Sequence, residues 1–214
     1  MLFALLALAG CGSGKGNPFA SFESRCAQLP RARFDVVQVP VSYREDGSQS
    51  IAALTRRSGT PPATHRTVGL TTATIGYQAQ IELRAVSDSR GGRACGTPNV
   101  HVELSLQPMT IYIAHELADN RCERESTLEH ELKHVAVHRE ALEEASAELR
   151  EALPAAIGVE LRTAWSQAEL ERILNLKVRN YLSEFIEGRH RLLRERQAEV
   201  DSPDEYQRLT TLCR

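Results

Sequence analysis

The chain has 214 residues, of which 42% are hydrophobic and 25% are charged, and its formal net charge is −2. These values are ordinary for a globular protein with one sizeable core. A nucleic-acid-binding surface needs a positive field and stacking side chains, so the weak negative charge and an aromatic content of 5% argue against that class of function.

The first residues have the composition of an export signal. Met1–Ala9 is an apolar run too short to cross a bilayer as a helix, and it leads into Gly10-Cys11. This pattern resembles the signal of bacterial lipoproteins, in which the cysteine becomes the lipidated first residue. The resemblance implies a signal peptide over residues 1–10, a lipid anchor at Cys11 and a tether over residues 11–25. The protein would then be exported and held at the membrane, facing the periplasm or the cell exterior; the alternative is a secreted protein in which Cys11 has no such role.

Four further cysteines follow the tether, namely Cys26, Cys95, Cys122 and Cys213. An even number of cysteines in an oxidising compartment favours disulfides, and four of them allow three pairings. We expect Cys95–Cys122, which would brace the segment leading into the second half, and Cys26–Cys213, which would tie the ends of the domain together. No Cys-x-x-Cys pair indicates a thiolate zinc site.

Residues 33–115 are rich in β-branched residues and predict strands. The clearest is Val100–Leu106, where apolar residues alternate strictly with others, as is typical of a strand buried on one face. The remaining candidates are residues 34–41, 51–55, 68–75, 77–86 and 109–114.

Residues 120–214 have helical periodicity instead. Asn120 and Ser126 are both candidate N-caps for a first long helix, and Pro154 should end that helix at Leu153. A second long helix is expected over residues 161–200. A short last helix should follow Ser202, which precedes a proline suited to a first helical turn.

The order of these segments predicts an α+β fold, because strands come first and helices follow. We expect a small antiparallel or mixed sheet followed by two long helices, all within one domain over residues 26–214.

One motif in the first long helix carries chemistry, the HExxH sequence from His130 to His134. Residues four apart lie on the same helix face one turn apart, so two imidazoles can bind one ion. Glu131 is their neighbour and a candidate general base, since a carboxylate beside a metal site can take a proton from water.

The motif makes the chain resemble the zincin class of metallopeptidases, in a gluzincin-like form. Val100–Leu142, about a fifth of the chain, also resembles DUF922-like predicted secreted zinc-dependent proteases. The resemblance implies a zincin-like fold, a Zn²⁺ cofactor and cleavage of peptide or amide bonds in a peptide or peptidoglycan-type substrate. It also implies that Met109–His115 is an edge strand beside the substrate. The alternatives are a non-catalytic metal-binding or structural lipoprotein of the envelope, and a helix whose histidines hold no metal.

The third metal ligand is the open question. His138 continues the series, but it lies about 12 Å from His130 along a straight helix, and two nitrogens on one ion are only about 3–3.5 Å apart. A gluzincin takes its third ligand, a glutamate, from a later helix. If the two long helices form a hairpin turning at residues 157–158, residue 182 lies opposite residue 132. Glu184 is therefore the expected third ligand, and His138 is the alternative.

Overall fold

The computed structural model describes residues 20–59, 66–88 and 92–213. The signal peptide expected over residues 1–10 and the anchor at Cys11 lie outside these residues. In chain order the elements are α1 (Phe22–Ala27), β1 (Arg33–Gln38), β2 (Arg44–Asp46), α2 (Ile51–Ser58), β3 (Gly69–Thr72), β4 (Ile75–Ser87), β5 (Ala94–Leu106), β6 (Thr110–Ile113), the 3-10 turn η1 (His115–Leu117), α3 (Arg121–Ile157), β7 (Arg162–Ala164), α4 (Gln167–Val200) and α5 (Pro203–Leu212).

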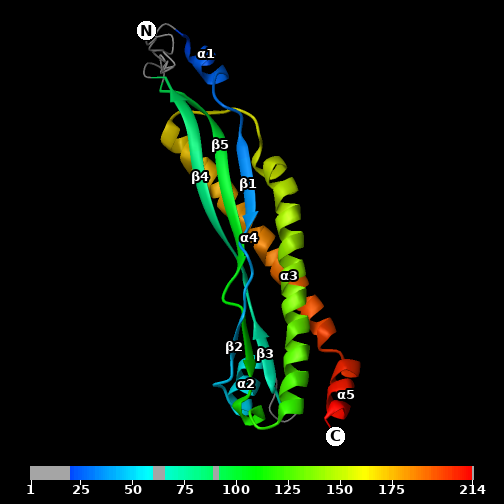
Figure 1. Ribbon diagram of the computed structural model, residues 1–214. Coiled ribbons are helices and arrows are strands. Elements are labelled where there is room, and N and C mark those ends of the chain that lie inside the picture. The colour runs from blue at the N-terminus through cyan, green and yellow to red at the C-terminus, as the bar shows by residue number, and fades with distance from the viewer. Residues whose placement is uncertain (1–19, 60–65, 89–91, 214) are drawn as a thin grey trace, which may run out of the picture.

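The strands form two mixed sheets, one above the other in Figure 1. The first has the order β1-β5-β4, with β1 parallel and β4 antiparallel to β5, and β7 pairs with one end of β5. The second has the order β2-β6-β3, with β2 parallel and β3 antiparallel to β6. The α+β fold with small mixed sheets and long helices is thus confirmed.

The two long helices run along the first sheet and enclose the core with it. α3 contacts β1, α4 contacts β4 and β5, and the two helices contact each other. Val102 and Leu104 of β5 and Leu142 and Leu149 of α3 are fully buried between these layers. The alternation expected for Val100–Leu106 is confirmed, because its even-numbered residues are buried and its odd-numbered ones are only partly so.

The segment expected to be a strand over residues 51–55 is the helix α2, so that prediction is wrong. The Ser50 hydroxyl accepts a hydrogen bond from the Ala53 amide at 3.1 Å, and Gly59 ends the helix with a φ of 73°. A serine N-cap and a left-handed glycine at the C-terminal end favour a helix locally. These signals outweigh the β-propensity of Ile51.

The first long helix begins at Arg121 with Asn120, the earlier of the two candidates, as its N-cap, but it runs past Pro154 to Ile157. A proline removes one backbone donor, yet it need not end a helix that packing holds in place. Leu153 and Ile157 are both fully buried, which keeps the last turn in the core. The second long helix starts later than expected, at Gln167, because residues 162–164 form β7.

The disulfides pair differently from the expectation: they are Cys26–Cys95 and Cys122–Cys213, with Cα–Cα distances of 6.0 and 5.7 Å. Cys95 lies at the end of β5 that pairs with β7, close to where α3 ends, whereas Cys122 lies at the start of α3. The length of this helix, about 55 Å, separates the two. Cys26 reaches Cys95 because residues from Phe22 onward form α1 rather than a tether.

The two disulfides are compatible with an exported protein. Among the helices of the described residues, none combines the length and the apolar character that a membrane crossing requires.

Candidate metal centre

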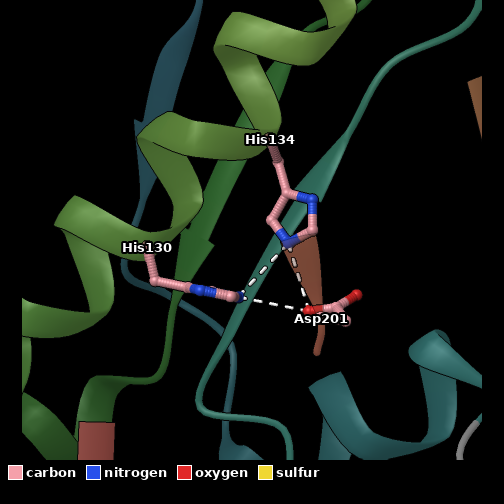
Figure 2. A group of neighbouring side chains, drawn as sticks. All are labelled: His130, His134 and Asp201. Carbon is pink, nitrogen blue, oxygen red and sulfur yellow. Dashed lines mark hydrogen bonds and ion pairs between the residues drawn. The ribbon is translucent and has the colours of Figure 1, made fainter. Parts of the chain in front are cut away.

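Two histidines of α3 and one aspartate after α4 bring three ligand atoms together (Figure 2). His130 Nε2 and His134 Nε2 are 3.2 Å apart. The carboxylate oxygen Oδ1 of Asp201 lies 3.2 Å from the first nitrogen and 3.3 Å from the second. The two histidines are 5% and 9% exposed, so the triangle lies mostly within the protein.

Asp201 takes the place expected for Glu184, and that prediction is not supported by the structure. Glu184 is exposed on α4 and does not belong to the group of ligand atoms. The expected hairpin turn at residues 157–158 assumes that α4 follows at once. Instead residues 158–166 cross to the first sheet and form β7, so the residue that faces His134 is Gln197. The shift brings the C-terminal end of α4, and hence Asp201, to the motif.

His138, the alternative ligand, lies outside the triangle as its helical spacing implies. It is 5% exposed, and its Nδ1 has no hydrogen-bond partner. Burial, together with the charge of the nearby His134, lowers the pKa of His138 to about 4. It is therefore a neutral buried imidazole one turn beyond the site.

The Nδ1 atoms of His130 and His134, which point away from the triangle, contact oxygen atoms. These contacts determine whether the Nε2 atoms carry hydrogen. His134 Nδ1 is hydrogen-bonded to Oε1 of Gln197, and the amide of Gln197 donates to the His134 carbonyl at 3.2 Å, which sets the orientation of the amide. His130 Nδ1 lies 3.3 Å from Oε1 of Glu205. Because a carboxylate and a carbonyl oxygen only accept, both Nδ1 atoms carry hydrogen, and in a neutral imidazole Nε2 then has a free lone pair.

Three atoms that each offer a lone pair therefore face one point. Because these atoms repel one another, the arrangement is stable only with a positive charge between them. Partial burial raises the pKa of Asp201, but the contacts with His130 and His134 outweigh it and hold that pKa well below its ordinary value. Burial lowers the pKa of His134, but the contacts with Asp201 and Gln197 outweigh it and raise that pKa. A proton can supply the charge in the metal-free protein, and a cation can replace it.

The triangle has the dimensions of a site for a tetrahedral metal ion. A tetrahedral ion with bonds of about 2.1 Å separates its ligand atoms by about 3.4 Å, close to the three separations of 3.2, 3.2 and 3.3 Å. Two imidazoles and a carboxylate are a donor set that a divalent ion such as zinc can use, and three protein ligands would leave a fourth position open.

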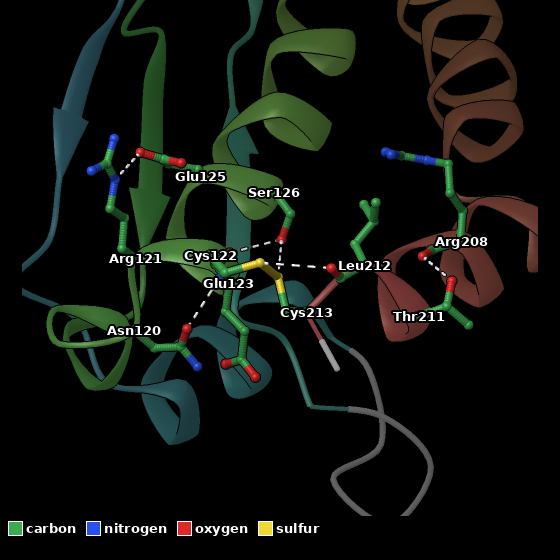
Figure 3. The surroundings of a disulfide bond; sticks show 10 residues. All are labelled: Asn120, Arg121, Cys122, Glu123, Glu125, Ser126, Arg208, Thr211, Leu212 and Cys213. Carbon is green, nitrogen blue, oxygen red and sulfur yellow. Dashed lines mark hydrogen bonds and ion pairs between the residues drawn. A yellow bond between two sulfur atoms is a disulfide. The ribbon is translucent and has the colours of Figure 1, made fainter.

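A network of charges fixes the outer contacts of this triangle. Glu205 of α5 accepts hydrogen bonds from Lys133 at 2.7 Å and from Arg208 at 2.8 Å. These partners, Arg208 first, hold the pKa of Glu205 well below its ordinary value. The Tyr206 hydroxyl donates to Asp201 at 3.0 Å. The disulfide Cys122–Cys213 ties the end of α5 to the first turn of α3 (Figure 3).

Glu131 faces β3, where a glycine makes room for it. The Thr71 hydroxyl donates to its carboxylate at 2.8 Å. A Cβ on Gly69 would lie only 2.5 Å from Oε1 of Glu131 and 2.5 Å from Cγ2 of Thr127. Burial raises the pKa of Glu131, opposed by the Thr71 hydrogen bond and the charges of the two histidines. A raised carboxyl pKa suits a general base that works near neutral pH.

The strand beside the site is β3 rather than the segment expected at residues 109–115. β6 is the central strand of its sheet, with β2 on one side and β3 on the other, so it has no free edge. The edge strand that carries Thr71 against Glu131 is thus β3. The sequence does not show that β2 pairs with β6, and it is this pairing that makes β6 a central strand.

One signal for Asp201 was available in the sequence. It lies between a long apolar stripe and the Ser202-Pro203 helix start, so it marks the junction of two helices. A carboxylate at such a junction can reach a neighbouring helix, but only the packing of α4 on α3 shows which one. No model of a known protein family matches the chain, and no curated protein or solved structure does so either.

Proposed function

We propose that the protein is a zinc-dependent hydrolase of peptide or amide bonds in the bacterial cell envelope. His130, His134 and Asp201 would hold the ion, and Glu131 would act as general base. The observation that carries the proposal is the convergence of three lone-pair atoms at zinc-like spacing, beside a buried carboxyl whose pKa is raised. When bound, zinc would polarise the scissile carbonyl and make water more acidic.

The residues around the ion have separable roles in this proposal. Gln197 and Glu205 hold the two imidazoles with their Nε2 atoms inward, which is what orienting contacts at metal sites do. Glu131 accepts a proton from the attacking water, and Thr71 holds its carboxylate in place from β3. Substrates would be peptides or peptidoglycan-type chains, in keeping with an exported protein.

A site that binds metal without turnover is the second candidate. Two surface hollows, lined by residues 45–47, 113–115, 118 and 124 and by residues 154, 155 and 158–162, include none of the three ligands. Asp201, whose side chain is 40% exposed, is the part of the triangle open to solvent. A buried ion with restricted access would suit a structural or binding role.

The experiment compares zinc binding and hydrolysis in the same variants. His130→Ala and Asp201→Ala should lose zinc, measured by titration and by elemental analysis of the purified protein. Glu131→Gln should keep zinc but lose hydrolysis of a panel of peptides and peptidoglycan fragments, and Glu184→Gln is the matched control that should keep both. Hydrolysis that survives Glu131→Gln in the zinc-loaded protein would contradict the proposed role of Glu131. A wild-type protein that takes up no zinc would contradict the metal site.

The lipid anchor is tested separately from the chemistry. In this proposal Cys11→Ala releases the protein from the membrane fraction of cells that export it, and the wild-type N-terminal peptide carries the mass of attached acyl chains. A membrane fraction unchanged by Cys11→Ala would contradict anchoring at this residue.

A further inference from the structure

The loop between α3 and α4, residues 158–166, presents apolar side chains to solvent. Val159, Leu161 and Trp165 are 56%, 42% and 77% exposed. Nine large hydrophobic side chains are exposed in the described part of the chain, and three of them lie within this nine-residue loop. Trp165 is also the only tryptophan of the chain. The loop is therefore the densest exposed apolar feature along the described sequence.

The fold holds this loop in shape from the inside. The guanidinium of Arg162 and the ammonium of Lys177 both donate to the Ile157 carbonyl at the end of α3, the second at 3.0 Å. Residues 162–164 pair with β5, and the amide of Trp165 donates to the Glu169 carboxylate at 3.2 Å. These contacts hold the backbone of the loop in place, so its apolar side chains are exposed from an ordered segment.

The loop lies at the same end of the molecule as α1 (Figure 1). Cys26 of α1 is bonded to Cys95, and Cys95 is the partner of Thr163 in the pairing of β5 with β7. Ala20 is the first described residue, and the nine residue steps from Cys11 to Ala20 can span at most about 32 Å.

We propose that residues 158–166 form a membrane-contacting tip, whose apolar side chains enter the interfacial region of the bilayer near the N-terminal segment. Tryptophan favours that region, because its ring is apolar and its N–H can reach water or a headgroup. Burying the exposed apolar area of the loop is favourable in lipid. A bilayer also suits the small size of the tip, since a stable contact between two copies would need more than about 1,000 Å².

The tip would determine how the molecule stands on the membrane. A lipid on a flexible tether leaves the orientation of a protein free, whereas a second contact at one end restricts it. His134 is 23 residues from Ile157 on the same helix, which is about 35 Å along the axis. The metal centre would thus be held away from the bilayer surface. This inference does not depend on hydrolysis or on metal binding.

The single tryptophan makes the test specific to the loop. The full-length chain is mixed with vesicles of equal parts phosphatidylethanolamine and phosphatidylglycerol, with and without bromine-labelled acyl chains, and binding is followed by sedimentation. We expect Trp165 emission to shift to shorter wavelength and to be quenched by the brominated lipid. The Val159→Ser/Leu161→Ser variant should lower the ratio of inserted to free tip by roughly tenfold. The matched control is Leu176→Ser/Leu192→Ser, which removes exposed leucines outside the loop and should change nothing.

If the tip does not contact lipid, the same experiment gives a different result. If the chain sediments with vesicles while Trp165 emission stays unchanged and unquenched, attachment is through the N-terminal residues alone and the tip proposal fails. Short-wavelength emission without vesicles that grows with protein concentration would show contact between copies. The same emission independent of concentration would show that the chain itself covers Trp165. Either result would overturn the proposal.

Discussion

Removing the disulfide Cys122–Cys213 should weaken zinc binding at a site that contains no cysteine. Helix α5, Pro203–Leu212, buries none of its residues, so little apolar contact holds it to α3. It is attached through this disulfide and through the contacts of Glu205 with His130 and Lys133. Without the disulfide, α5 can leave α3 and remove Glu205 from the imidazole that it orients.

The size of the effect follows from the role of Glu205. Loss of such an orienting contact typically weakens metal binding about 10- to 100-fold, or about 1.4–2.7 kcal/mol. We therefore expect this loss of zinc affinity in the Cys122→Ser/Cys213→Ser variant. It is measured by competition with a chromophoric chelator, with hydrogen exchange reporting on the docking of α5.

The second disulfide supplies a matched control. The two bonds close sequence separations of 91 and 69 residues, so each should stabilise the fold by about 4–5 kcal/mol through chain entropy. Cys26→Ser/Cys95→Ser should thus lose similar unfolding free energy and yet keep its zinc affinity, because this bond lies at the opposite end of the molecule. Equal zinc affinities in the two double variants would refute the reasoning.

Three further predictions test the site and its surroundings. Asp201→Asn should lower zinc affinity by more than the about 10- to 100-fold that is typical of losing an orienting contact, while Glu184→Gln should leave it unchanged. The reverse order, found by the same chelator titration, would restore Glu184 as the ligand. His138 has a depressed folded pKa of about 4, so its contribution to stability is present above its unfolded pKa of about 6.5 and is lost as pH falls toward 4, by about 3 kcal/mol. Denaturant unfolding of the metal-free protein should show this loss, and His138→Leu should show a smaller one; equal pH dependence in the two would contradict it. Gly69→Ala should destabilise the fold by about 1–3 kcal/mol because its methyl group would overlap Glu131 and Thr127. Gly76→Ala is the control, since nothing lies within 4 Å of the added Cβ. Thermal unfolding should show the loss of stability in the first variant and not in the second.

Local sequence patterns determined the parts of this protein that depend on neighbouring residues. Helical spacing placed His130 and His134 on one face, and the Nε2 atoms do meet. The cap at Asn120, the helix start at Ser202 and the alternating strand Val100–Leu106 are also where the sequence predicts them. Each of these features is set by interactions within a few residues along the chain.

Only the tertiary structure decided which distant residues join them. Asp201 joins His130 and His134 because residues 158–166 leave α3 as a connection in which β7 pairs with β5, which shifts the register of α4 against α3. The same shift places α5, and with it Cys213, beside Cys122. Cys26 reaches Cys95 for a different reason, because α1 packs on β4, the neighbour of β5. Periodicity specifies the face of a helix but not its axial position on another helix, since that position is set by the length and course of the connection.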